Sequence, residues 1–157
     1  MRHTICAALV AGALSVLAHA ALADGSPESA VGDDPNFKAG KSALDAKNWK
    51  AAIDAFSRAS AKHKDEPDIY NYLGYAYRKS GDLDNAFKYY TWALRIEPAH
   101  RGAHEYMGEA YLMKNDLASA EKQLGDLERL CQKSCVEYKD LAEAISDFKA
   151  KKPVASR

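Results

Sequence analysis

Two cysteines near the C-terminal end are the residues best suited to covalent chemistry. Three residues separate Cys131 from Cys135, whereas redox-active pairs of the thioredoxin kind enclose two and accompany a strand pattern that is absent here. We therefore expect a structural disulfide, with free thiols or a redox-active pair as the alternatives. If both cysteines lay in one undistorted helix, the geometry of their side chains would be near the limit for a disulfide bridge. We therefore expect a helix break at residues 132–134, with Ser134 capping the next helix.

Two histidines are the next candidates. His100 and His104 are four residues apart, beside Glu105, and could in principle hold a metal ion on one helical face. No third ligand follows at a useful spacing, and the pair lies at a junction between two helical units. We therefore expect helix-capping and loop roles for the histidines, and no metal site.

No other pattern indicates catalysis. The sequence contains no phosphate-binding loop, no nucleophile paired with a base and no pair of buried carboxylates, since every acidic residue is expected on an exposed face or at a helix cap. We therefore expect no enzyme activity and no cofactor. The 22 basic and 22 acidic residues give a formal net charge of zero, which gives no indication of nucleic-acid binding.

The first 23 residues are typical of an export signal. A short basic start is followed by an almost wholly apolar run from Ile5 to Leu17 and by two A-x-A sites, at residues 18–20 and 21–23. The apolar run is too short to cross a bilayer of about 30 Å as a helix, so an uncleaved anchor is the weaker alternative. We expect cleavage after Ala23, no stable membrane span afterwards, and a periplasmic or secreted mature chain, in an alanine-rich context typical of bacteria.

The rest of the chain divides into segments of different composition. Residues 24–34 are rich in Gly, Pro, Ser and acid, which predicts a disordered leader. Helical patterns then run over residues 35–134, as three units at about 33–66, 67–100 and 101–134. Residues 135–151 form a last helix with a single apolar stripe, as a terminal cap requires, and residues 152–157 are a polar tail. The stripe consists of Tyr138, Leu141, Ala142, Ile145 and Phe148.

The three units repeat with a period of 34 residues. Gly40, Gly74 and Gly108 share this spacing, as do the sets Ala52/Ala86/Ala120 and Phe56/Tyr90/Leu124. This period indicates stacked pairs of helices, in which small residues allow close approach and a large side chain fills the remaining gap. In the middle unit, Pro67 begins the first helix, Gly81 ends it, and Asp82 caps the second helix.

These residues closely resemble the tetratricopeptide repeat. The middle unit matches its pattern throughout, with Tyr70, Leu73, Gly74, Tyr77, Ala86, Tyr90, Ala93 and Pro98. The third unit departs from the pattern at His104 and Leu127 and has no closing proline, and the first departs at Asn36 and Ala43. The resemblance implies an all-α fold: a right-handed α-solenoid of three such repeats and a C-terminal capping helix. It also implies that the first helix of each pair lines a concave groove that holds a peptide or a protein.

The family layout implies which side chains face this groove, and we expect Tyr75 and Arg78 among them to face solvent. Some family members hold a C-terminal carboxylate with basic groove residues, but Glu105 and Glu109 lie in the third-repeat part, so such a ligand is not expected. The alternative is that these positions carry ordinary solvent-exposed residues that have no role in binding. The implied groove residues are Phe37, Lys41, Asn71, Tyr75, Arg78, Glu105 and Glu109.

The sequence therefore predicts a non-catalytic adaptor that binds a protein or an extended peptide in its groove. The alternative is a structural accessory subunit that assembles through its convex face or its ends.

Overall fold

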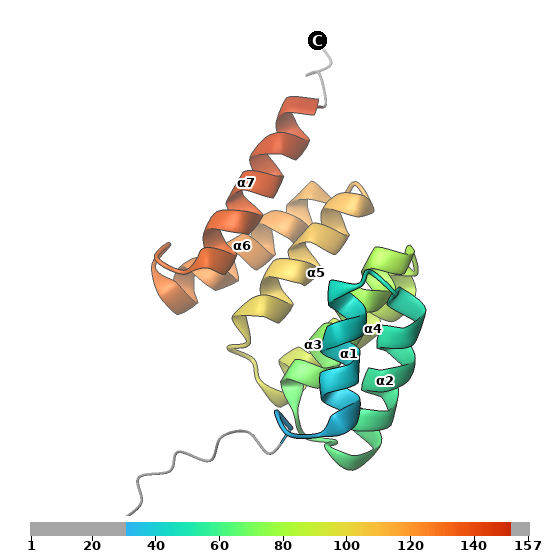
Figure 1. Ribbon diagram of the computed structural model, residues 1–157. Helices are drawn as coiled ribbons and strands as arrows, with labels where there is room; N and C mark the ends of the chain where they lie inside the picture. The colour runs from blue at the N-terminus through green and yellow to red at the C-terminus, as the bar shows by residue number, and fades with distance from the viewer. Residues whose placement is uncertain (1–30, 152–157) are drawn as a thin grey trace, which may run out of the picture.

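The computed structural model describes residues 31–151. The expected export signal, most of the expected leader and the tail lie outside these residues. The described part contains seven α-helices and no strand (Figure 1), which confirms the all-α helical-repeat fold. The helices are α1 (Pro35–Asp45), α2 (Trp49–Lys62), α3 (Pro67–Ser80), α4 (Leu83–Ile96), α5 (Arg101–Met113), α6 (Leu117–Cys131) and α7 (Val136–Lys151).

Residues that recur at the 34-residue period also set the helix boundaries. Asn48, Asp82 and Asp116 each precede the second helix of a pair, and their side chains accept a hydrogen bond from a first-turn N–H at 3.0–3.1 Å. The middle repeat's first helix ends at Gly81, whose φ of +92° is accessible to glycine at little cost. Asn115 has a φ of +60° at the corresponding place in the third repeat, a conformation that asparagine tolerates better than most residues. The boundaries expected for the middle repeat are therefore confirmed.

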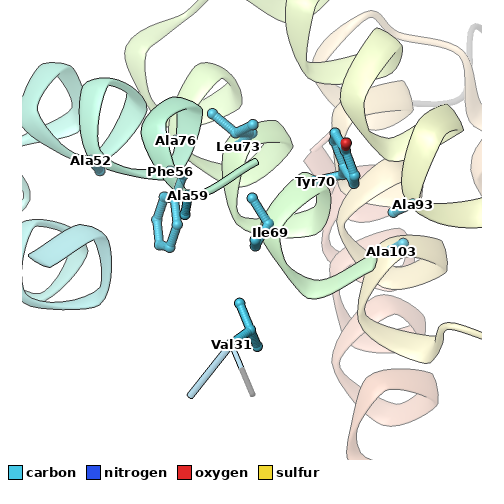
Figure 2. Packing of buried hydrophobic residues seen from close by; sticks show 10 residues of the cluster. All are labelled: Val31, Ala52, Phe56, Ala59, Ile69, Tyr70, Leu73, Ala76, Ala93 and Ala103. Atoms are coloured by element: carbon cyan, nitrogen blue, oxygen red, sulfur yellow. The ribbon is translucent and has the colours of Figure 1, made fainter. Parts of the chain in front are cut away.

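Residues 31–34, which precede α1, are held in place by packing and hydrogen bonds, so the expectation of disorder is wrong for these four residues. Val31 is 3% exposed and belongs to the buried cluster that contains Phe56 and Ile69 (Figure 2). Asp34 caps α1 by accepting hydrogen bonds from the N–H groups of Asn36 and Phe37, at 2.7 and 3.1 Å. Burial opposes ionisation of Asp34, but these hydrogen bonds and the neighbouring His63 and Lys62 lower its pKa to about 2. Composition suggested disorder, but one apolar anchor and one cap hold the segment in place.

Glycine positions mark where the helices of a pair come closest. A Cβ added to Gly40 would lie 2.6 Å from the ring of Phe56, and one added to Gly74 would lie 2.5 Å from the ring of Tyr90. The expected packing of a small residue against a large one is thus confirmed in the first two repeats. In the third, a Cβ on Gly108 would lie 2.5 Å from Leu141 of α7, and Leu124 is not among its nearest neighbours. Leu124 is shorter than an aromatic residue, and a side chain of the capping helix fills the gap.

The capping helix packs against both α5 and α6, and the stripe predicted for it is buried at Leu141 and Ile145. Its start differs from the prediction. The hydroxyl of Ser134 donates to the carbonyl of Cys131 at 2.6 Å, and the carbonyl of Cys135 accepts from the N–H of Lys139. Cys135 therefore holds the cap position expected for Ser134, because the serine side chain closes the end of α6 instead. None of the described helices is both long and apolar enough to cross a membrane.

We predict that Gly74→Ala lowers the free energy of unfolding by about 1–3 kcal/mol, because the added methyl group is forced against the Tyr90 ring. Gly125→Ala is the matched control, since a Cβ there meets only the end of Arg129, at 3.9 Å, and should gain about 0.5–1 kcal/mol from helix propensity. Urea denaturation followed by circular dichroism measures both. Equal stability of the two variants would contradict the close contact.

Candidate binding groove

The first helices of the three repeats form one side of the solenoid together with the capping helix. α3 contacts α5, and α5 contacts α7, although one helix lies between the members of each pair in sequence. We call α1, α3, α5 and α7 the inner row. An open pocket of about 180 Å³ joins three of these helices, and three of its six lining residues are tyrosines. The lining residues are Lys41, Leu44, Asp45, Tyr72, Tyr75 and Tyr106.

Lys41 and Tyr75 are the predicted groove residues that line this pocket. The ammonium of Lys41 donates to the Tyr72 hydroxyl at 3.0 Å and lies 4.1 Å from the centroid of that ring. The rings of Tyr75 and Tyr106 are 5.0 Å apart between centroids, so adjacent repeats contribute to one aromatic surface. We did not predict Tyr72 or Tyr106 from the sequence, yet the 34-residue spacing between them is a signal that could have identified the pair.

Phe37 and Asn71 are placed mainly by packing. The Phe37 ring makes edge-on contacts with Phe56 and Tyr72, at centroid distances of 5.7 and 5.8 Å. Asn71 is only 4% exposed, and its Oδ1 has no hydrogen-bond partner among the described residues. Its amide nitrogen faces Gly102 at the start of α5, where an added Cβ would lie 3.2 Å away. Phe37 thus supports the groove from behind, and Asn71 lies in the contact between α3 and α5.

Arg78 does not face solvent, so the expectation of an exposed side chain is wrong. It is 4% exposed; its Nε donates to the Tyr90 hydroxyl at 3.3 Å, and its Nη1 pairs with the Glu109 carboxylate. The guanidinium also lies 5.3 and 5.5 Å from the ring centroids of Tyr75 and Tyr106. The physical reason is the tyrosine at the core position of the middle repeat. Burial raises the pKa of the Tyr90 phenol well above its usual range, and the buried hydroxyl takes the arginine as a hydrogen-bond donor.

The acidic end of the inner row is also more buried than expected. Glu105 is 8% exposed, and burial raises its pKa to about 8, with Glu109, Asp140 and Glu137 adding repulsion and Arg78 opposing them. The expectation that every acidic residue lies on an exposed face or at a cap is therefore wrong. The prediction failed because it considered each helix alone, whereas α7 packs against α5 and places Glu137 and Asp140 near Glu105.

The histidines have the capping and loop roles predicted for them. His100 Nδ1 accepts a hydrogen bond from the Ala103 N–H at 3.1 Å, which caps α5, and its Nε2 lies 3.0 Å from an Asp68 carboxylate oxygen. The ring nitrogens of His104 contact Gln123 Oε1 at 2.8 Å and the Pro98 carbonyl at 3.0 Å. All four ring nitrogens therefore have protein partners. Among the described residues, no group of three or more potential ligands is arranged to hold a metal ion.

The two cysteines lie at the corner between α6 and α7. Gln132 and Lys133 adopt left-handed conformations, with φ of +51° and +67°, which confirms the expected break in the helix. The Cα atoms of Cys131 and Cys135 are 5.8 Å apart, and their sulfur atoms face one another as a disulfide pair. The geometry therefore suits a bridge at this corner.

Comparison with known proteins agrees with the fold. Residues 37–96 match one family model of the tetratricopeptide repeat, and residues 77–145 match a second. The chain belongs to the tetratricopeptide-repeat family. It is 27% identical, over 75 residues, to the human protein O-mannosyl-transferase TMTC3; this match covers 48% of the chain and 8% of the human protein.

Several solved structures share the fold at low sequence identity. The second TPR domain of human RPAP3, in complex with the HSP70 peptide SGPTIEEVD, has a TM-score of 0.64 and 18% identity, covering 73% of this chain and 92% of that one. The TPR2B domain of yeast Sti1, in a complex with pHsp70, has a TM-score of 0.66 and 15% identity, with coverage of 74% and 95%. The type III secretion translocator chaperone SycD of Yersinia enterocolitica has a TM-score of 0.65 and 16% identity, with coverage of 74% and 82%.

We predict that Arg78→Ala lowers the free energy of unfolding by about 2–4 kcal/mol, because it leaves the Glu109 carboxylate and the Tyr90 hydroxyl without their partner. Lys79→Ala is the matched control, since the neighbouring lysine is exposed and should change stability by no more than about 0.5 kcal/mol. Chemical denaturation of both variants is the measurement. A stable Arg78→Ala protein would mean that the guanidinium is solvated after all.

We predict that Glu105→Gln raises the melting temperature, and that the gain grows from about pH 5 to pH 8. The pKa of Glu105 is raised from 4.5 to about 8 on folding. Below pH 4.5 the carboxyl is protonated in both states; at higher pH the unfolded chain loses this proton first, so the wild-type protein loses stability as pH rises to about 8. Glu121→Gln, on the exposed side of α6, is the matched control for the loss of a carboxyl group. Thermal melts of the variant and the wild-type protein at several pH values test this. If the difference between their melting temperatures did not change with pH, Glu105 in the wild-type protein would be an ionised, hydrated carboxylate.

Proposed function

We propose that this protein is a non-catalytic adaptor that binds a protein or an extended peptide along its inner row. The observation that carries the proposal is the aromatic pocket shared by α1, α3 and α5. Tyrosine rings provide contact area at low cost in conformational entropy, and their hydroxyl groups provide hydrogen bonds. Lys41 and Asp45 at the same pocket add charged groups that can fix the orientation of a bound chain.

Relatives of the same fold support this proposal by analogy. The human RPAP3 and yeast Sti1 domains are described in complexes with HSP70-derived ligands. A ligand held by its terminal carboxylate does not suit this chain, because Glu105 and Glu109 occupy the third-repeat part of the inner row and Arg78 is already paired with Glu109. The proposed partner is therefore recognised in a different way.

A second candidate is assembly through the outer face or the ends, as a structural accessory subunit. Trp92 on α4 favours it, because this large side chain is 45% exposed and lies 5.6 Å from the Tyr70 ring. Met113 and Val136, near the C-terminal end of the solenoid, are also exposed, at 51% and 62%. Such residues are compatible with a protein contact, but they come from three different helices. The pocket that Met113 lines contains one aromatic residue, Phe148, whereas the inner-row pocket contains three.

Site-specific photo-cross-linking separates the two candidates. A benzoyl-phenylalanine placed at Asp45, which is exposed and lines the pocket, should capture a partner from the native extract. The same residue placed at Trp92 should capture little or none. Mass spectrometry of the products identifies the captured segment. Capture at Trp92 and not at Asp45 would reject groove binding in favour of outer-face assembly.

Export to the periplasm is the second part of the proposal. It is supported by the pattern of residues 1–23, which suits a cleavable signal, and by the paired cysteines, because disulfides persist in oxidising compartments. A bridge between Cys131 and Cys135 would fasten the start of α7 to the end of α6. The closed loop is short, so its entropic contribution lies at the low end of the usual range of about 0–5 kcal/mol.

We predict that protein isolated from the periplasm begins at Asp24 and takes up no thiol label at Cys131 or Cys135. Alkylation without reductant, followed by intact-mass measurement, reports both features. Adding reductant before the alkylation should give two labels and should increase hydrogen exchange in α7 before the other helices, because the bridge holds its first turn. Two labels without reductant would reject the bridge, and recovery of the uncleaved chain would reject the signal.

A further inference from the structure

Four carboxylates from two inner-row helices lie together at the C-terminal half of the groove. Glu105 and Glu109 come from α5, and Glu137 and Asp140 come from α7; we call this group the acidic seam. The starts of α7 and α5 pack together at this place, because Leu141 lies against Gly108 and a Glu137 oxygen lies 3.6 Å from Arg101. This arrangement raises the pKa of the Glu105 carboxyl, through burial and through repulsion from the other three acids. The seam exists because α7 packs directly against α5.

The cations near the seam are already engaged. Arg78 pairs with Glu109 and donates to Tyr90. Arg101 lies 3.6 Å from a Glu137 oxygen, and its own side chain is 52% exposed. Among residues 31–151, no basic side chain lies within ion-pairing distance of Glu105 or Asp140. The seam therefore contains carboxyl groups that no cation of the described residues pairs with. Burial and the neighbouring acids raise the pKa of Glu105 to about 8, and a cation supplied by a partner would favour its ionised form.

Buried acceptors without donors give a second and independent signal. Glu137 Oε2 and Asn71 Oδ1 are both buried and lack hydrogen-bond partners in the described part of the chain. Asn71 is 4% exposed and faces Gly102, which lies one helical turn before Glu105 on α5. Buried polar atoms are almost always paired in native proteins. Two buried oxygens, one of them on Glu137 in the seam itself, can therefore each accept a further hydrogen bond.

The aromatic pocket and the acidic seam are adjacent, because the Arg78 guanidinium pairs with Glu109 and also lies 5.5 Å from the centroid of the Tyr106 ring. Tyr106 lines the pocket and directly follows Glu105 in α5, and its ring lies 5.0 Å from that of Tyr75. A chain that lies along the inner row would therefore meet tyrosine rings first and carboxylates next. A guanidinium suits this surface well, since it stacks on aromatic rings, pairs with carboxylates and carries five N–H donors and no acceptor.

We propose that the partner segment bound in this groove carries an arginine or lysine side chain that enters the acidic seam and pairs with Glu105 and Asp140. This inference rests on the proposed function, because it assigns the chemistry of the ligand to the same groove. The expected ligand is a basic stretch of polypeptide, with an aromatic or apolar neighbour for the tyrosine pocket.

Selection from a phage-displayed library of random 12-residue peptides tests the charge preference. The purified protein should enrich arginine and lysine at least about threefold over the input library. The double variant Glu105→Gln, Asp140→Asn should lose this enrichment, because it removes the two unpaired carboxyl groups while keeping the side-chain shapes. The control Glu121→Gln, Glu128→Gln removes two exposed charges from α6 and should retain it. Circular-dichroism melts establish that each variant is folded.

A selected peptide then permits a double-mutant cycle, which isolates the pairwise interaction. Replacing its basic residue by the neutral isostere citrulline should weaken binding at least tenfold for the wild-type protein and less than twofold for the double variant, as measured by fluorescence anisotropy. Equal losses for the two proteins would overturn the pairing. If the selected peptides show no charge preference but still block cross-linking at Asp45, the preference for a basic residue is wrong and groove binding stands. A library that gives no binder at all would count against groove binding itself.

Discussion

The close contact between a glycine of one helix and a large side chain of another is the constraint on which this structure depends. Gly40 against Phe56 and Gly74 against Tyr90 leave no room for a Cβ, so each pair of helices has a single close arrangement. Because the contact recurs every 34 residues, the first helices come to lie side by side, and α3 contacts α5 directly. The groove is thus a consequence of core packing repeated at a fixed period.

The same core contact also sets the charges of the groove. The middle repeat fills its gap with Tyr90, whose ring packs like Phe56 but whose hydroxyl needs a partner. Arg78 supplies the donor from the inner row and becomes buried there, and its charge is matched by Glu109. That pairing takes the guanidinium away from Glu105, which remains nearly buried beside three other acids. A single phenolic oxygen in the core thereby leaves a carboxyl group without an ion-pair partner in the groove.

The sequence predicted the features that depend on neighbouring residues and missed those that depend on how repeats stack. Caps such as Asp82, breaks such as Gly81 and the glycine contacts of the first two repeats all follow from spacing within 34 residues. The burial of Arg78 and Glu105 depends on contacts between α3, α5 and α7, which no single-repeat pattern contains. The 34-residue relation between Tyr72 and Tyr106 was available in the sequence. Val31 was missed for a different reason, since the average composition of a segment hides one anchoring side chain.

The capping helix is part of the groove as well as the end of the solenoid. Leu141 fills the space beside Gly108 that an aromatic residue fills in the other repeats, and one turn of the same helix supplies Glu137 and Asp140 to the acidic seam. The position of these carboxylates therefore depends on the packing that closes the core. Cys131 and Cys135 lie at the corner where this helix begins, so a bridge there restrains the first turn of α7, which carries Glu137 and directly precedes Asp140. Stability of the cap and the charge presented to a partner are coupled through this one turn.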